Sequence, residues 1–143
     1  MIQKLPKTKQ IELVLSERVF EIVDSYPNPN ELLDNHRFVD FIDVTESELF
    51  AYVQEHGFPS GNVAEEGGSF PFHGDNQYRI EFADNAWQLF YAERGQKNQE
   101  QSFETQEAAR KRLVEMLFES AKITLNHRYI HAHPELDERD PAK

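Results

Sequence analysis

The chain has 143 residues, a net charge of −11, 38% hydrophobic residues and no cysteine. This length matches one domain that can bury a hydrophobic core, and the lack of cysteine excludes disulfides, thiolate metal sites and a cysteine nucleophile. No apolar run approaches the length of a membrane span, so we expect a soluble, cytoplasmic protein.

The excess negative charge lies in one part of the chain. Thirteen acidic and two basic residues fall between Glu12 and Glu66, whereas acids and bases cancel in the rest of the sequence. A field of this sign repels nucleic acid and speeds association with a basic protein, so it favours a protein partner. The alternative is that the acidic surface serves only solubility.

Two elements are expected before residue 45. Apolar residues recur at helical spacing from Thr8, a candidate N-cap, to Tyr26, and they predict an N-terminal helix that Pro27 ends. The segment "RFVDFIDV", residues 37–44, is rich in Phe, Val and Ile, which is typical of a short strand.

A capped helix and a long loop are expected next. Thr45 and Glu48 have the spacing of a capping box, and Gly57 supplies the helix stop. The following segment is rich in glycine, so we expect a long irregular loop at residues 57–76, with a short edge segment at 70–72.

The segment "QYRIEFADNAWQLFYAERGQ" predicts an aromatic β-hairpin at about residues 77–92. Asp84 and Asn85 tolerate the left-handed backbone that a two-residue turn demands. With this turn, the six larger side chains are directly opposed on one face, as the pairs Phe82 and Trp87, Ile80 and Leu89, and Tyr78 and Tyr91. A slip of one residue would destroy the match, so the register is well specified.

A polar loop, "ERGQKNQEQS", is expected after the hairpin, with a turn at Gly95 and a structural role for Arg94. A long helix follows, with Thr105 as its N-cap and an apolar stripe from Ala109 to Thr124. We expect this stripe to cover the hairpin face, so that the aromatic rings are mostly core. The tail loses this periodicity, and residues 134–143 are expected to be disordered.

The histidines of the tail are the only candidate metal ligands with a recognisable spacing. His127, His131 and His133 form H-x-x-x-H-x-H, and Glu135 and Asp137 follow. Pro134 breaks regular structure and there is no HExxH motif, so we expect neither a metal nor a cofactor. A metal-dependent enzyme that uses these histidines stays open as an alternative.

No motif for catalysis stands out. The sequence has no phosphate-binding glycine loop with its lysine and no G-x-S-x-G elbow, and its carboxylates have no marked nucleophile beside them. We therefore expect the chain not to be an enzyme.

The pattern "Y-x-I-x-F … W-x-L-x-Y-x-E-R-G … F-x-T", from Tyr78 onward to Leu117, resembles the strand–strand–helix core of small bacterial immunity proteins. These proteins neutralise polymorphic or contact-dependent toxins. The resemblance implies a non-enzymatic cytoplasmic inhibitor that occludes the active site of one cognate toxin domain. The acidic half agrees with this, because many such toxins are nucleases with basic clefts.

The sequence thus predicts a single α+β domain at residues 1–133, in which an N-terminal helix, a short capped helix and a long C-terminal helix pack on an antiparallel sheet. The partner is expected to be a toxin domain with a basic surface, without nucleic acid or membrane. The predicted partner-binding residues are Asp40, Asp43, Glu46, Glu48, Glu55, Glu65 and Glu66. The alternative function is a small-molecule-binding or regulatory module, with loop 57–76 as a lid over Tyr78, Trp87 and Tyr91.

Overall fold

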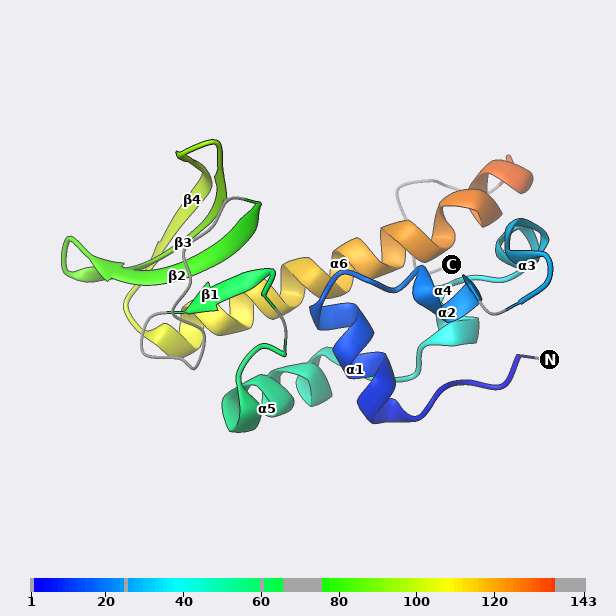
Figure 1. Ribbon diagram of the computed structural model, residues 1–143, viewed down its shortest axis with the longest axis horizontal. Coiled ribbons are helices and arrows are strands. Elements are labelled where there is room, and N and C mark those ends of the chain that lie inside the picture. Colours follow the sequence, from blue (N-terminus) through cyan, green and yellow to red (C-terminus); the bar gives the residue numbers. More distant parts are fainter. Residues whose placement is uncertain (1, 25, 60, 66–75, 136–143) are drawn as a thin grey trace. The chain divides into compact units, whose positions relative to one another are not determined.

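The structure of the protein is a computed structural model that describes residues 2–24, 26–59, 61–65 and 76–135. The chain divides into two compact units. The helical unit comprises Met1–Thr45 and Leu117–Lys143, and the sheet unit comprises Glu46–Met116. The long helix α6 (Gln106–Ala132) contributes its first part to the sheet unit and its second part to the helical unit (Figure 1).

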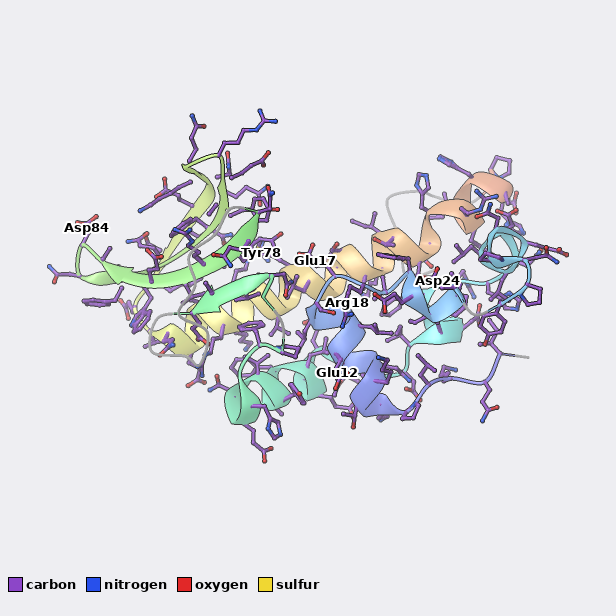
Figure 2. The ribbon with its side chains drawn as sticks, viewed as in Figure 1. Glu12, Glu17, Arg18, Asp24, Tyr78 and Asp84 are labelled. Carbon is purple, nitrogen blue, oxygen red and sulfur yellow. The ribbon has the colours of Figure 1, made fainter. Side chains whose placement is uncertain are left out.

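The helical unit holds four short helices before α6: α1 (Lys7–Leu15), α2 (Glu21–Asp24), α3 (Pro29–Asn35) and α4 (Phe38–Phe41). The N-terminal helix expected as far as Tyr26 is therefore wrong in its length. It breaks after α1, where Glu17 has a φ of 60° and the amide of Arg18 donates to the carbonyl of Leu13 at 2.9 Å. This six-to-one bond is the mark of a helix-ending Schellman motif. Figure 2 labels Glu17 and Arg18 at this break.

The periodicity persisted across the break because both sides bury their apolar residues. Leu13 and Val14 before the break and Val19 and Ile22 after it are all at most 7% exposed. Hydrophobic spacing reports burial and not continuity of the backbone, so it cannot locate such a turn.

The strand expected at residues 37–44 is wrong, because this segment contains α4. The carboxylate of Asp40 accepts the backbone N–H of Arg37 at 2.8 Å and so closes a capping box over the first turn. Phe38 and Phe41 are buried, whereas Val39 is 44% exposed. A short apolar run is compatible with a buried helical turn as well as with a strand. Here the capping box formed by Asp40 favours the helical turn.

The sheet unit contains α5 (Glu46–His56), a four-stranded sheet and the start of α6. The strands are β1 (Val63–Glu65), β2 (Gln77–Ala83), β3 (Ala86–Glu93) and β4 (Gln96–Phe103), in the order β1-β2-β3-β4. The α+β class and the long C-terminal helix are confirmed. The sheet is mixed and not wholly antiparallel, because β1 pairs with β2 in parallel.

The hairpin register is confirmed at every predicted pair, with Phe82 opposite Trp87, Ile80 opposite Leu89 and Tyr78 opposite Tyr91. Asp84 and Asn85 form the turn with φ values of 55° and 62°. Both central residues of a type I′ turn need a positive φ. Figure 2 labels Asp84 at the tip of the β2–β3 hairpin.

The polar loop expected after the hairpin is wrong, because residues 96–103 form strand β4. Arg94 and Gly95 make the connecting turn with φ values of 53° and 74°, which confirms a turn at Gly95. β4 lies at the edge of the sheet and most of it is exposed, so polar side chains cost it little. Part of the long loop is β1, and its expected edge segment at residues 70–72 lies outside the described residues.

The short capped helix and the long C-terminal helix are both present, and the long helix extends further than predicted. α5 ends where predicted, since Gly57 has a φ of 77° and its amide donates to Val53 at 2.8 Å. The hydroxyl of Thr105 accepts the amide of Ala108 at 3.0 Å and caps α6. α6 continues to Ala132, so the helix extends beyond the predicted apolar stripe into the polar tail. Leu125 and Ile130 are buried and anchor the extra turns.

The start of α6 packs on the predicted aromatic face of the sheet. Glu65 pairs with Ile80 and Gln101 pairs with Leu89, so both lie on that face. Glu65 accepts from Gln106 of α6 at 2.8 Å, and Gln101 donates to Met116 of α6 at 3.6 Å. The covering helix is thus the one that the sequence predicted.

The rings are less deeply buried than expected. Ile80 and Leu89 at the centre of the face are 0% and 1% exposed, whereas Tyr78, Trp87 and Tyr91 are half-buried and Phe82 is 50% exposed. The aliphatic pair therefore forms the core beneath α6, and the rings border it.

Candidate protein-binding site

A groove of about 440 Å³ lies between α5 and the first part of α6. Both helices belong to the sheet unit in this region. They run in opposite directions (Figure 1), and Arg110 near the start of α6 donates to Gln54 near the end of α5 at 3.2 Å. We call this feature the α5–α6 groove.

One stripe of α5 forms the first wall. Its residues follow the spacing i, i+3, i+4 and i+7, which places them on one side of a helix. They are Ser47, Phe50, Ala51 and Gln54, with Glu46 at the helix start. The buried residues Leu49 and Val53 lie on a different stripe of the same helix. α5 therefore has a second apolar side, on which Phe50 and Ala51 line the groove.

One stripe of α6 forms the second wall, again at helical spacing. Its residues are Glu107, Lys111, Val114 and Glu115. Val114 is 1% exposed and forms part of the floor with Phe50 and Ala51. The floor is therefore apolar, and the charged residues stand along its rim.

Carboxylates occupy both ends of the groove. Because the helices are antiparallel, Glu46 at the start of α5 lies at the same end as Glu115, and Glu107 lies at the other end. Lys111 is the cation between them, and Glu115 makes an exposed pair with Arg112 at 3.8 Å. The residues that line the groove include three carboxylates and one cation, so the lining carries a net negative charge.

The predicted partner-binding residues are distributed over both units. Asp40 and Asp43 belong to the helical unit, and Glu46, Glu48, Glu55 and Glu65 to the sheet unit, while Glu66 lies outside the described residues. Of the six predicted residues that the structure describes, Glu46 alone lines the α5–α6 groove. Glu48 and Glu55 are seven residues apart on α5 and share a side that faces away from Glu46.

Three of these carboxylates have local structural roles. Asp40 caps α4, and Asp43 accepts the side-chain N–H of the buried Gln10 at 2.9 Å. Glu65 is 8% exposed and forms an ion pair with Arg110. Glu65 is therefore buried and paired within the sheet unit, and its side chain has little exposed surface.

Sequence reasoning missed most of the groove. Glu107 and Glu115 were outside the acidic half, and their position opposite Glu46 depends on the antiparallel packing of two helices. The available signal was the pair Phe50 and Ala51, which extends the apolar side of α5 beyond the stripe of Leu49 and Val53.

His127 and His131 lie in the last turns of α6, and His133 follows directly after the helix. The rings of His127 and His131 lie 4.4 Å apart, and His133 stacks on Tyr129 at 4.1 Å. Among the described residues, no group of three or more histidine, aspartate or glutamate side chains has the geometry to hold a metal ion.

No helix in the described part of the chain combines the length and the apolar character that a bilayer crossing requires. The sequence matches no protein-family model, and no curated protein and no solved structure shows significant similarity to it.

Proposed function

We propose that this protein is a non-enzymatic, cytoplasmic inhibitor that binds a basic face of one cognate bacterial toxin domain, as immunity proteins do. The observation that carries the proposal is the α5–α6 groove, with its apolar floor and its carboxylates at both ends. The sequence pattern from Tyr78 to Leu117 supports the same class of protein.

The groove combines the two components of a protein-binding site. Burial of the floor residues Phe50 and Ala51 by a partner removes apolar surface from water, which is the main favourable contribution to association. The carboxylates of Glu46, Glu107 and Glu115 select a partner with positive charge and steer its approach. Affinity and specificity thus have separate sources in one site.

The net charge of −11 supports the choice of partner. Toxins that act on nucleic acid need basic clefts, and an acidic protein competes with phosphate for the same cations. The remaining exposed carboxylates of the first half, among them Asp43 and Glu55, add to the attraction at longer range.

The test is binding of the purified protein to the product of the gene immediately upstream of its own, measured by calorimetry at about 50 mM and about 500 mM salt. We expect tight binding that weakens as salt increases and inhibition of the toxin in the same mixture. The double variant Glu46→Lys and Glu115→Lys should weaken binding at least tenfold, because it places cations against the partner's cations.

Glu119→Lys is the matched control, since Glu119 is an exposed residue of α6 that does not line the groove. This variant should bind about as well as the unmodified protein. Absence of binding, or binding that salt does not affect, would contradict the proposal.

A small-molecule-binding module is the second candidate, and the partial exposure of Trp87 and Tyr91 favours it. Its test is quenching of the fluorescence of Trp87, the sole tryptophan, by a library of metabolites. Saturable quenching by one compound would support this function.

A further inference from the structure

The two walls of the α5–α6 groove leave a space for a third helix. Each wall is a single stripe of a helix, at residues 47–54 of α5 and 107–115 of α6. A third helix that lies along both stripes packs by inserting its own ridge of side chains between theirs. We infer that the partner of this protein inserts one amphipathic helix with basic ends into the α5–α6 groove. This inference rests on the proposed function, since it names the part of the toxin domain that binds.

The small residues of α5 favour a helix as the occupant. Ser47 and Ala51 are exposed and four residues apart, so they lie on consecutive turns of the wall. Side chains of this size let a second backbone approach closely, as in tightly packed helix pairs. The partly exposed ring of Phe50 then contacts the apolar stripe of the incoming helix.

The rim charges define the sequence pattern of the partner helix. Glu107 and Glu115 are eight residues apart on α6, which corresponds to about 12 Å at the rise of an α-helix. A helix that lies alongside therefore needs lysine or arginine at two positions seven or eight residues apart. Its residues between these cations and facing the groove must be apolar. Lys111 disfavours a third cation at the centre.

Charge excludes a second copy of this chain as the preferred occupant. Each copy carries a net charge of −11, so association of two copies brings like charges together. The most basic stretch of the chain, Arg110 to Arg112, already belongs to α6, and Arg110 is engaged by Glu65 and Gln54. The occupant is accordingly a basic segment of a different protein.

The first experiment uses a stapled helical peptide of about 15 residues, because free helices of this length are marginal in water. Its apolar stripe is leucine at helical spacing, with two lysines eight residues apart. Titration into the isotopically labelled protein is followed by amide chemical shifts. We expect the largest shifts at Ser47, Ala51, Gln54 and Lys111, which all line the groove.

Two further peptides serve as matched controls. The same helix with glutamates for the lysines should cause no shifts, because its charges oppose those of the rim. An unstapled version of the peptide in which a central residue is replaced by proline should bind at least tenfold more weakly, because proline breaks the helix. Equal binding of the broken peptide would overturn the helix inference, and so would shifts outside the groove.

Variants of the protein separate this inference from the proposed function. Ala51→Trp fills the groove and should weaken both the peptide and the toxin domain more than tenfold. His56→Trp, at an exposed position on another side of α5 that does not line the groove, should affect neither. Toxin binding that survives Ala51→Trp supports the proposed function and overturns the helix inference. Binding of the peptide in the groove without any binding of the toxin domain would support the helix inference and contradict the proposed function.

Discussion

The guanidinium of Arg110 on α6 donates to the carboxylate of Glu65 on β1, and Glu65 is a buried residue with an exposed fraction of 8%. Gln106, one turn earlier on α6, donates to the same oxygen at 2.8 Å. β1 has only three residues and lies at the edge of the sheet. The ion pair therefore fixes a short edge strand to the helix that covers the sheet.

Loss of the charge at Glu65 should destabilise the protein. Glu65→Gln leaves Arg110 with a neutral partner at a position where its own side chain is 21% exposed. Removal of one partner from a fully buried pair costs about 3–5 kcal/mol, so we expect about 2 kcal/mol at this partly exposed site. Urea unfolding followed by circular dichroism measures the difference. Glu55→Gln, in an exposed position of α5, is the control and should change the free energy of unfolding by less than about 0.5 kcal/mol.

Asn126 should be required for the stability of the helical unit. It is 0% exposed, and its side-chain oxygen accepts the backbone N–H of Phe38 at 2.7 Å. Asn126→Leu leaves that buried N–H without an acceptor, which costs about 1–3 kcal/mol. Thermal unfolding of the variant should show the loss.

The control for this prediction is Asn35→Leu, because Asn35 donates to the carbonyl of Glu31 on the exposed surface. Water replaces that bond, so the expected cost is below about 1 kcal/mol. The side-chain nitrogen of Asn126 is buried without a hydrogen-bond partner, and leucine removes this group. An Asn126→Leu variant as stable as the unmodified protein would show that this gain offsets the lost bond.

The bulge in β4 offers a stabilising substitution. Leu89 pairs with Gln101 and Tyr91 pairs with Asn98, so Phe90 faces two residues, Gln99 and Glu100. Gln99 has a φ of 57°, a conformation that costs a residue with a side chain about 1–2 kcal/mol and glycine almost nothing. After the entropy that glycine loses on folding, Gln99→Gly should raise the free energy of unfolding by about 0.5 kcal/mol.

The neighbouring residue provides the matched comparison for the bulge. Glu100 is also exposed and has no positive φ, so Glu100→Gly should lower the free energy of unfolding by about 0.5–1 kcal/mol. Opposite signs for the two variants in urea unfolding are the expected result. A loss of stability in both would show that the left-handed conformation at residue 99 carries no strain.

Phe82 should shield Trp87 from water. The two rings meet edge to face with centroids 5.5 Å apart, and Phe82 is 50% exposed. Phe82→Ala should increase quenching of Trp87 fluorescence by acrylamide and cost about 1 kcal/mol, the typical value of an aromatic pair. Phe20→Ala is the control, since Phe20 is 51% exposed in the other unit and should leave the quenching unchanged.

Local chemistry accounts for the elements that were predicted correctly. The turn at Asp84 and Asn85 and the stop at Gly57 depend on backbone conformations that few residues adopt, so a short sequence suffices to place them. The N-cap at Thr105 is equally local. Direct opposition of large side chains then fixed the hairpin register.

The errors concern segments whose structure depends on distant partners. β4 is polar and becomes a strand because β3 supplies its hydrogen-bonding neighbour. The end of α6 continues because Leu125 and Ile130 find buried positions. The sequence of β4 alone does not reveal its pairing with β3, and the sequence at the end of α6 does not reveal that Leu125 and Ile130 are buried.

By itself, the sequence determined the α+β class, the hairpin and its register, and the excess of acidic residues, because each follows from neighbouring residues or from composition. Only the tertiary structure decided which carboxylates are exposed and which lie close together. It buries Glu65 in an ion pair with Arg110 and places Glu46 across a groove from Glu107 and Glu115. The reason is that exposure and proximity are properties of packed surfaces, and residues far apart in the chain acquire them only when helices and strands pack together.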